Sequence, residues 1–94
     1  MKTSEILKRA IARIRRGWCK GATIKHIRGK WHYCSIGAIT VDTPWMEYTK
    51  AKEILQDIIG PGQVSNWNDH HKTTKRKVLA AFEKAYRLAK ERGL

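Results

Sequence analysis

The chain has 94 residues, of which 20 are Lys or Arg and eight are Asp or Glu, so its net charge is +12 at pH 7. Because 41% of the residues are hydrophobic, we exclude a disordered chain and expect one compact domain over residues 1–94. So many uncompensated cations repel one another in the folded state, which predicts a polyanionic partner: nucleic acid, an anionic membrane surface or an acidic protein. The alternative is a basic, solubilising surface without such a partner.

The first predicted element is a helix over residues 3–16, followed by Gly17. Its apolar side chains recur at three- and four-residue spacing and form one stripe, made of Ile6, Leu7, Ala10, Ile11 and Ile14. We expect Thr3 or Ser4 to cap its start, and we expect Gly17 to take the left-handed conformation after its end. Charges interrupt this segment every two or three residues, which argues against a signal peptide.

Residues 18–34 predict a β-hairpin, with two strands around the turn sequence RGK. Strand alternation places Trp31 and Tyr33 on one face of the second strand. Residues 35–41 suit either a short helix or a third strand, and Gly37 weakens both interpretations.

The second half of the chain predicts two more amphipathic helices. One starts at Thr43, with Pro44 in its first turn, and ends before the GPG sequence at 60–62. A polar loop is expected over 63–72, and a last helix runs from Thr73 or Thr74 to about residue 91. In that helix Glu83 precedes Arg87 by four residues, which favours a surface pair.

This order of elements predicts the α+β class. We expect a small antiparallel β-hairpin or sheet packed with three amphipathic helices in a single compact domain. No apolar run approaches the roughly 18 residues of a membrane span, so we expect no membrane partner and a cytosolic protein with two free thiols.

Two similar motifs contain the cysteines: GWCKGA at 17–22 and HYCSIGA at 32–38. Three interpretations follow. The sulfurs could join imidazoles in a metal site, or a cysteine could act as a nucleophile activated by a histidine. The metal site would draw on Cys19, Cys34, His26, His32, His70 and His71. The nucleophile would be Cys19 or Cys34, activated by His70 or His71, with Asn68 or Asp69 orienting the ring. We favour the third, in which both cysteines are small core residues beside tightly packed Gly-Ala pairs, with no catalytic residue, metal or cofactor.

These motifs, with NWND at 66–69 and the Thr-capped sequence TTKRKVLAAFEKA at 73–85, resemble an uncharacterised family of small domains found in phages and actinobacteria. The resemblance extends over nearly the whole chain, although Tyr33 stands where that family has Trp and the stretch 39–60 is shorter than usual. The histidines do not fall on the family pattern. The resemblance implies a fold and a phage-like setting in the host cytosol, and it implies no reaction.

Trp67, Asn68 and Asp69 form the most site-like stretch. In the architectural interpretation Trp67 anchors the segment while Asn68 and Asp69 bond to free backbone groups. In the functional interpretation the three residues form a polar pocket that contacts a ligand.

Basic residues fall into three groups that suit phosphate contacts. The first is a phosphate clamp at the start of the last helix, where free N–H groups also attract anions. The second is on the first helix, and the third is in the hairpin, where Trp31 is the best residue to stack on a base. The first group is Lys72, Lys75, Arg76 and Lys77. The second is Lys8, Arg9, Arg13, Arg15 and Arg16, of which we expect Arg13 and Arg16 to contact phosphates. The third is Lys25, Arg28 and Lys30, of which we expect Arg28 and Lys30 to do so. The alternative for each group is a solvated basic face.

The sequence therefore predicts a small, non-catalytic, phage-type accessory protein. It would bind the phosphate backbone of a nucleic acid, or bind a complex that handles nucleic acid. The first alternative is a protein-interaction module that inhibits or redirects a host factor, such as a defence system, by docking the same basic face on an acidic surface of that factor. The second is a small enzyme or metal protein built on the cysteines and histidines. No helix-turn-helix, zinc-finger or RNA-recognition signature is present.

Overall fold

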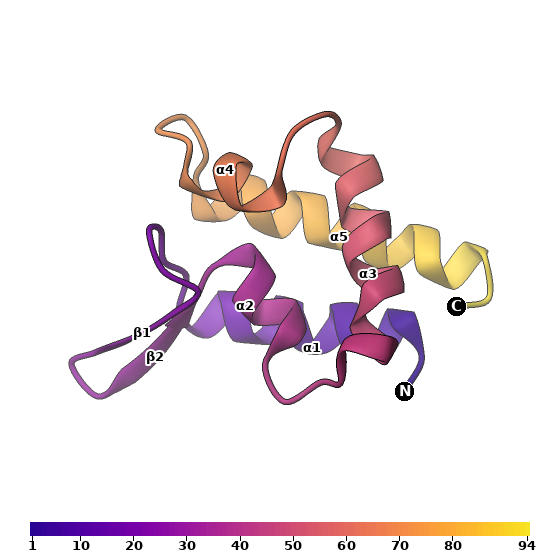
Figure 1. Cartoon of the computed structure of the whole chain (residues 1–94), viewed down its shortest axis with the longest axis horizontal. Coiled ribbons are helices and arrows are strands. Elements are labelled where there is room, and N and C mark those ends of the chain that lie inside the picture. Colours follow the sequence, from indigo (N-terminus) through magenta and orange to yellow (C-terminus); the bar gives the residue numbers. More distant parts are fainter.

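Five helices and one β-hairpin make up the fold, seen in a computed structural model that describes residues 1–94 (Figure 1). The α+β prediction is confirmed. In chain order the elements are α1 (Thr3–Arg16), β1 (Ile24–Ile27), β2 (Lys30–Tyr33), α2 (Ser35–Thr40), α3 (Trp45–Ile59), α4 (Val64–Asp69) and α5 (Lys75–Glu91). None of the helices combines the length and apolarity needed to cross a lipid bilayer.

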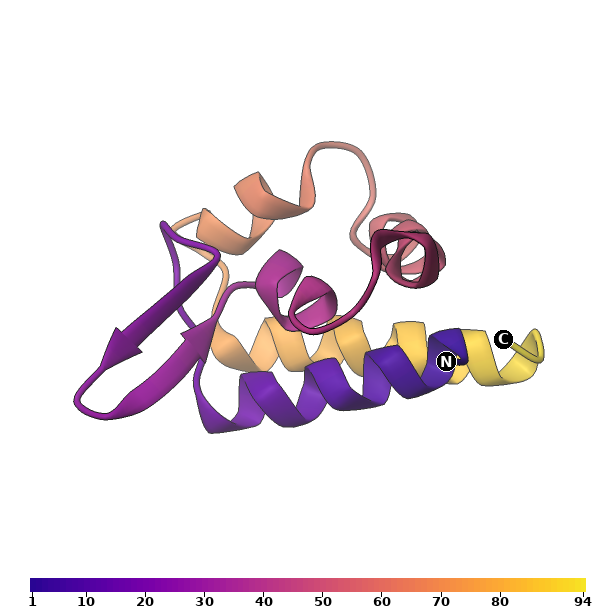
Figure 2. The same cartoon turned by 60° about the horizontal axis from the view of Figure 1, so that its bottom comes forward.

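The amphipathic helices α1 and α5 form the base of the core. They run antiparallel and side by side along the long axis of the molecule, and α3 packs across them (Figure 2). The predicted stripe of α1 is buried throughout and meets Val78 and Phe82 of α5, which are fully buried. Truncating a fully buried Phe costs about 3–5 kcal/mol, so this contact makes a large contribution to the stability of a small domain.

The hairpin projects from one end of the helical body (Figure 2). Its strands pair with Ile24 opposite Tyr33 and His26 opposite Trp31, and all four β1 residues are exposed. Arg28 and Gly29, with φ of 51° and 79°, form a two-residue turn of the kind that matches strand twist. The apolar stripes of the helices therefore pack against one another, and the hairpin stays largely outside the core.

Residues 35–40 form the helix α2, which resolves the choice left open by the sequence. Cys34 caps it, because its Sγ accepts a hydrogen bond from the Gly37 N–H at 3.3 Å. A Cβ on Gly37 would collide with the carbonyl oxygen of Thr23, so the glycine permits a close backbone approach.

The polar loop predicted over 63–72 is wrong, because Val64–Asp69 forms α4. Its inner face is carried by Val64 and Asn68, which lie one turn apart and are both buried. Because Asn68 takes the place of a second apolar residue on this face, the apolar spacing typical of a helix is missing from the sequence.

Several predicted helix starts and ends differ in detail. Lys2 occupies the N-cap of α1 without a side-chain bond, and Thr3 and Ser4 lie buried inside the helix. Gly17 is extended, with φ of −173°, and is required because Trp31 and His32 occupy the space of a Cβ.

In the second half, α3 begins at Trp45 after Pro44, so Thr43 is not its cap. Gly60 ends α3 with φ of 88°, and Thr74 caps α5 by accepting from the Lys77 N–H, as predicted. Glu83 pairs at 3.0 Å with Arg15 of α1, so the predicted pair with Arg87 is wrong.

Candidate functional site

The motifs singled out in the sequence meet at the side chain of Asn68, which is fully buried. Its Oδ1 accepts hydrogen bonds from the Trp18 indole N–H at 2.8 Å and from the Ser35 backbone N–H and hydroxyl at 2.9 and 2.6 Å. Its Nδ2 donates to the Cys19 carbonyl at 3.1 Å and to the Asp69 carboxylate at 3.0 Å. Every polar atom of Asn68 is occupied, so the architectural interpretation describes this residue.

Asp69 continues the same network at the surface. Its Oδ1 accepts from the Gly21 N–H at 3.0 Å, at a backbone position with φ of 77° that favours glycine. Hydrogen bonds from the Asn68 amide and from Gly21 lower the pKa of Asp69 below its ordinary value. The carboxylate therefore fixes the GWCKGA loop on the end of α4.

The three residues of the predicted polar pocket face different surroundings. Asp69 lines a cleft of about 510 Å³ between the 21–23 loop, α3 and α4, together with Lys52 and Cys34. Trp67 is half-buried and packs on the core beside Ile58 and Ile59, away from that cleft. The structure thus brings one of the three predicted residues to this cleft.

Both cysteines are buried free thiols, as expected for core residues. The Cys19 thiol donates to the Ala22 carbonyl at 3.4 Å, while Cys34 caps α2. Burial raises the pKa of Cys19, and the nearby Cys34 raises it further. A buried thiol with a raised pKa is a poor nucleophile at neutral pH.

Three of the four histidines make ring contacts, and these lie in two separate parts of the chain. His70 stacks on His71 with ring centroids 4.4 Å apart, and His26 lies 4.6 Å from the Trp31 ring. No group of three or more His, Cys, Asp or Glu side chains is arranged to hold a metal ion. The structure supplies no ligand set for the metal interpretation.

The cations are mostly free of acidic partners. Among the 20 Lys and Arg side chains, only Arg15 and Lys50 lie within 4.0 Å of a carboxylate, that of Glu83 and Glu53 respectively. The end of α1, the start of α5 and the hairpin lie at the same end of the molecule (Figure 1). The Lys75 ammonium group donates to the Arg15 carbonyl at 2.8 Å, which joins two of the three predicted basic groups.

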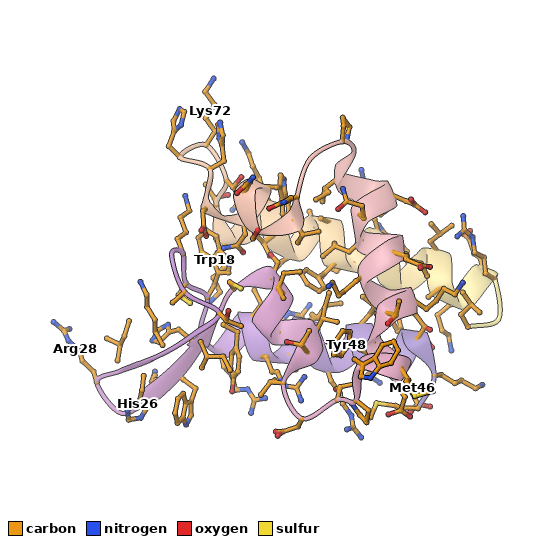
Figure 3. All side chains as sticks on the ribbon, in the orientation of Figure 1. Trp18, His26, Arg28, Met46, Tyr48 and Lys72 are labelled. Carbon is orange, nitrogen blue, oxygen red and sulfur yellow. The ribbon has the colours of Figure 1, made fainter.

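The predicted phosphate clamp at the start of α5 is partly engaged with the protein itself. Lys75 bonds to α1, and the Lys77 ammonium donates to the Lys72 carbonyl at 2.9 Å. Arg76 and Lys72 are exposed, and Lys72 stands at the tip of its loop (Figure 3). Arg13 is half-buried and donates to the Ala38 carbonyl at 2.9 Å, which links α1 to α2.

The most organised cationic feature is a cleft of about 480 Å³ between the end of α1 and the hairpin. We call it the basic cleft, and its lining residues are Arg15, Arg16, Lys30, Trp31 and Tyr33. Trp31 is 56% exposed. Arg28 stands outside it at the hairpin tip (Figure 3).

The predicted residues Arg16, Lys30 and Trp31 are brought together in the basic cleft, while Arg15 and Tyr33 were not among the predicted site residues. Strand alternation already placed Tyr33 on the Trp31 face, and that was the signal available in the sequence.

Comparisons with known proteins identify the chain only at the level of a family. No curated protein and no solved structure matches it. One family model, described as "Family of unknown function (DUF6197)", matches residues 1–88, in line with the resemblance to an uncharacterised family. The chain therefore belongs to the DUF6197 family.

Proposed function

We propose that the protein binds nucleic acid through the basic cleft and the cations around it, without catalysing a reaction. The observation that carries this proposal is the grouping of Arg15, Arg16 and Lys30 around the exposed indole of Trp31. A nucleic acid offers the matching chemistry, because it carries phosphates for the cations and flat bases for the aromatic ring.

The surrounding charge supports the same partner. The net charge is +12, and few of the cations are neutralised by nearby carboxylates. Binding of this kind releases counterions from the phosphate backbone, so it depends strongly on salt and little on sequence. A cytosolic location and a phage-type accessory role belong to the same proposal.

We test the proposal with the double variant Arg16→Gln/Lys30→Gln, which removes two cations from the basic cleft. Binding of a labelled 20-nucleotide single strand is measured by fluorescence anisotropy from 25 to 200 mM NaCl. We expect weaker binding at low salt and a salt slope that is smaller by about 1.4, since each lost contact to a single strand contributes about 0.7.

The matched control is Arg87→Gln/Lys90→Gln, which removes two cations from the opposite half of α5. Both side chains are exposed, so the net charge changes equally while the basic cleft stays intact. The control should retain the wild-type slope. Absence of binding at 25 mM NaCl, or equal losses in both double variants, would contradict the proposal.

A second candidate is the predicted protein-interaction module, whose basic face would dock on an acidic surface of a host factor. It is favoured by Trp45 and Met46, which are 67% and 77% exposed at the start of α3 (Figure 3 labels Met46). Exposed Trp and Met side chains suit protein contacts. A pull-down from nuclease-treated lysate separates the candidates: a protein partner persists, and one bridged by nucleic acid is lost.

A further inference from the structure

We infer that the basic cleft accepts single-stranded nucleic acid in preference to duplex, with one unstacked base seated on Trp31. This inference rests on the proposed function and specifies which form of nucleic acid the cleft selects.

The hairpin register prepares Trp31 as a stacking surface. His26 lies opposite Trp31 in the antiparallel pair, and the two rings are 4.6 Å apart with a 45° tilt. The histidine supports the indole from the neighbouring strand while 56% of the Trp31 surface stays exposed. An aromatic side chain held in place loses little conformational freedom when a base stacks on it.

Tyr33 extends the aromatic surface along the strand. It is two residues from Trp31 and on the same face of β2, so the side chains are spaced by about 7 Å. Tyr33 lies in the same basic cleft, at its half-buried inner side. A base on Trp31 therefore has a second aromatic group beside it, deeper in the cleft.

The concave position of the indole discriminates between single strand and duplex. Arg15 and Arg16 form one wall at the end of α1, and Lys30 and Trp31 form the other on β2. A duplex exposes its phosphates and hides the faces of its bases in the stack, so it reaches the cations and leaves the indole unused. A single strand can turn a base out of the stack at low cost.

The chemistry of the lining residues favours binding without strong sequence preference. Arg and Lys attract the phosphates that every nucleotide carries, and every base has a flat face that can stack on Trp31. We therefore expect homopolymers of different bases to bind with similar affinity.

The test compares Trp31→Ala with wild type on a labelled 20-nucleotide single strand and on the corresponding duplex. Loss of one stacked base should weaken single-strand binding about 5- to 150-fold and leave the salt slope unchanged, because no charge is removed. Duplex binding should not change, and Trp31→Phe should keep most of the single-strand affinity. The control is Trp45→Ala, at a tryptophan on α3 that is even more exposed than Trp31 and lies outside the basic cleft.

A second measurement keeps the wild-type protein and replaces the bases of the single strand with abasic sites. It should reproduce the loss seen with Trp31→Ala without any change to the fold. Equal affinity for duplex and single strand, or an unchanged affinity of Trp31→Ala, would overturn the inference. In that case a cation-dependent salt slope would still uphold the proposed function, whereas absence of binding to either form would overturn both.

Discussion

Asn68 shows how one polar side chain can organise a small domain. Four of its five side-chain hydrogen bonds reach residues 33 to 50 positions away, in the 18–19 segment and at Ser35, and the fifth reaches Asp69. The carbonyl oxygen accepts three of these bonds and the amino group donates two. An apolar residue of similar size could fill the space, but it would leave the partners of Asn68 without hydrogen bonds in the interior.

We predict that Asn68→Ala lowers the free energy of unfolding by about 3 kcal/mol or more, because several buried donors lose their acceptor. Urea unfolding at pH 7 measures this. The matched control is Asn66→Ala on the exposed side of the same helix, which should change stability by less than about 0.5 kcal/mol.

A milder variant tests the same network if Asn68→Ala does not fold. Trp18→Phe keeps an aromatic ring and removes the indole N–H that donates to Asn68, so we expect a loss of about 1–2 kcal/mol. A loss for Asn66→Ala as large as that for Asn68→Ala would show that Asn68 has no special role.

At the scale of the elements, the sequence predicted those helices and strands whose formation depends on the local pattern of their own residues. The helices α1 and α5 have continuous apolar stripes, and the hairpin has a turn with glycine between alternating strands. The pattern failed where the deciding contact comes from elsewhere in the chain. Helix α4 depends on a buried Asn68 whose partners lie on distant segments, so local polarity pointed to a loop.

The candidate site follows the same division. Residue type and charge indicated Arg16, Lys30 and Trp31, but no local pattern shows that the end of α1 faces the hairpin. That arrangement depends on the backbone bonds of Tyr33 to Gly17 and Cys19, at 3.0 and 3.1 Å. Backbone hydrogen bonds between distant segments produce no periodic pattern of residue types, so they cannot be predicted from the sequence.

The short helix α2 provides a test of packing against intrinsic helix propensity. Gly37→Ala improves helix propensity by about 1 kcal/mol, yet its Cβ would collide with the Thr23 carbonyl oxygen. We expect the collision to prevail, with a net destabilisation of about 1–3 kcal/mol in urea unfolding. The comparison variant is Gly29→Ala in the hairpin turn, where no neighbour lies within 4 Å and only the positive φ opposes the substitution. A Gly37→Ala protein that is more stable than wild type would contradict this assignment.

At the scale of the whole molecule, charge is the dominant property. A net charge of +12 is carried on a body of only 38 × 26 × 20 Å. The screening length is about 10 Å at 0.1 M salt, so repulsion acts mainly between neighbouring cations and grows as salt is removed. Their mutual repulsion opposes the folded state, and the polyanion that we propose as a partner would relieve it.

We predict that added salt has opposite effects on stability and on binding. Between 20 and 300 mM NaCl the melting temperature of the free protein should rise, because screening weakens the repulsion, and a gain of about 1 kcal/mol corresponds to about 4–8 °C. Over the same range nucleic-acid binding should weaken. Differential scanning calorimetry measures the first effect, and Arg87→Gln/Lys90→Gln should show a smaller rise. A melting temperature that is constant or falls with salt would refute the prediction.

The network around Asn68 also restricts which substitutions this position can accept. An amide that accepts three bonds and donates two has no equivalent among the other side chains of its length, and Gln is longer by one methylene. Drift at this position would have to be matched by simultaneous changes in segments that are distant in the gene. We therefore expect a change at position 68 to be tolerated only together with changes at Trp18 and Ser35, its two distant side-chain partners.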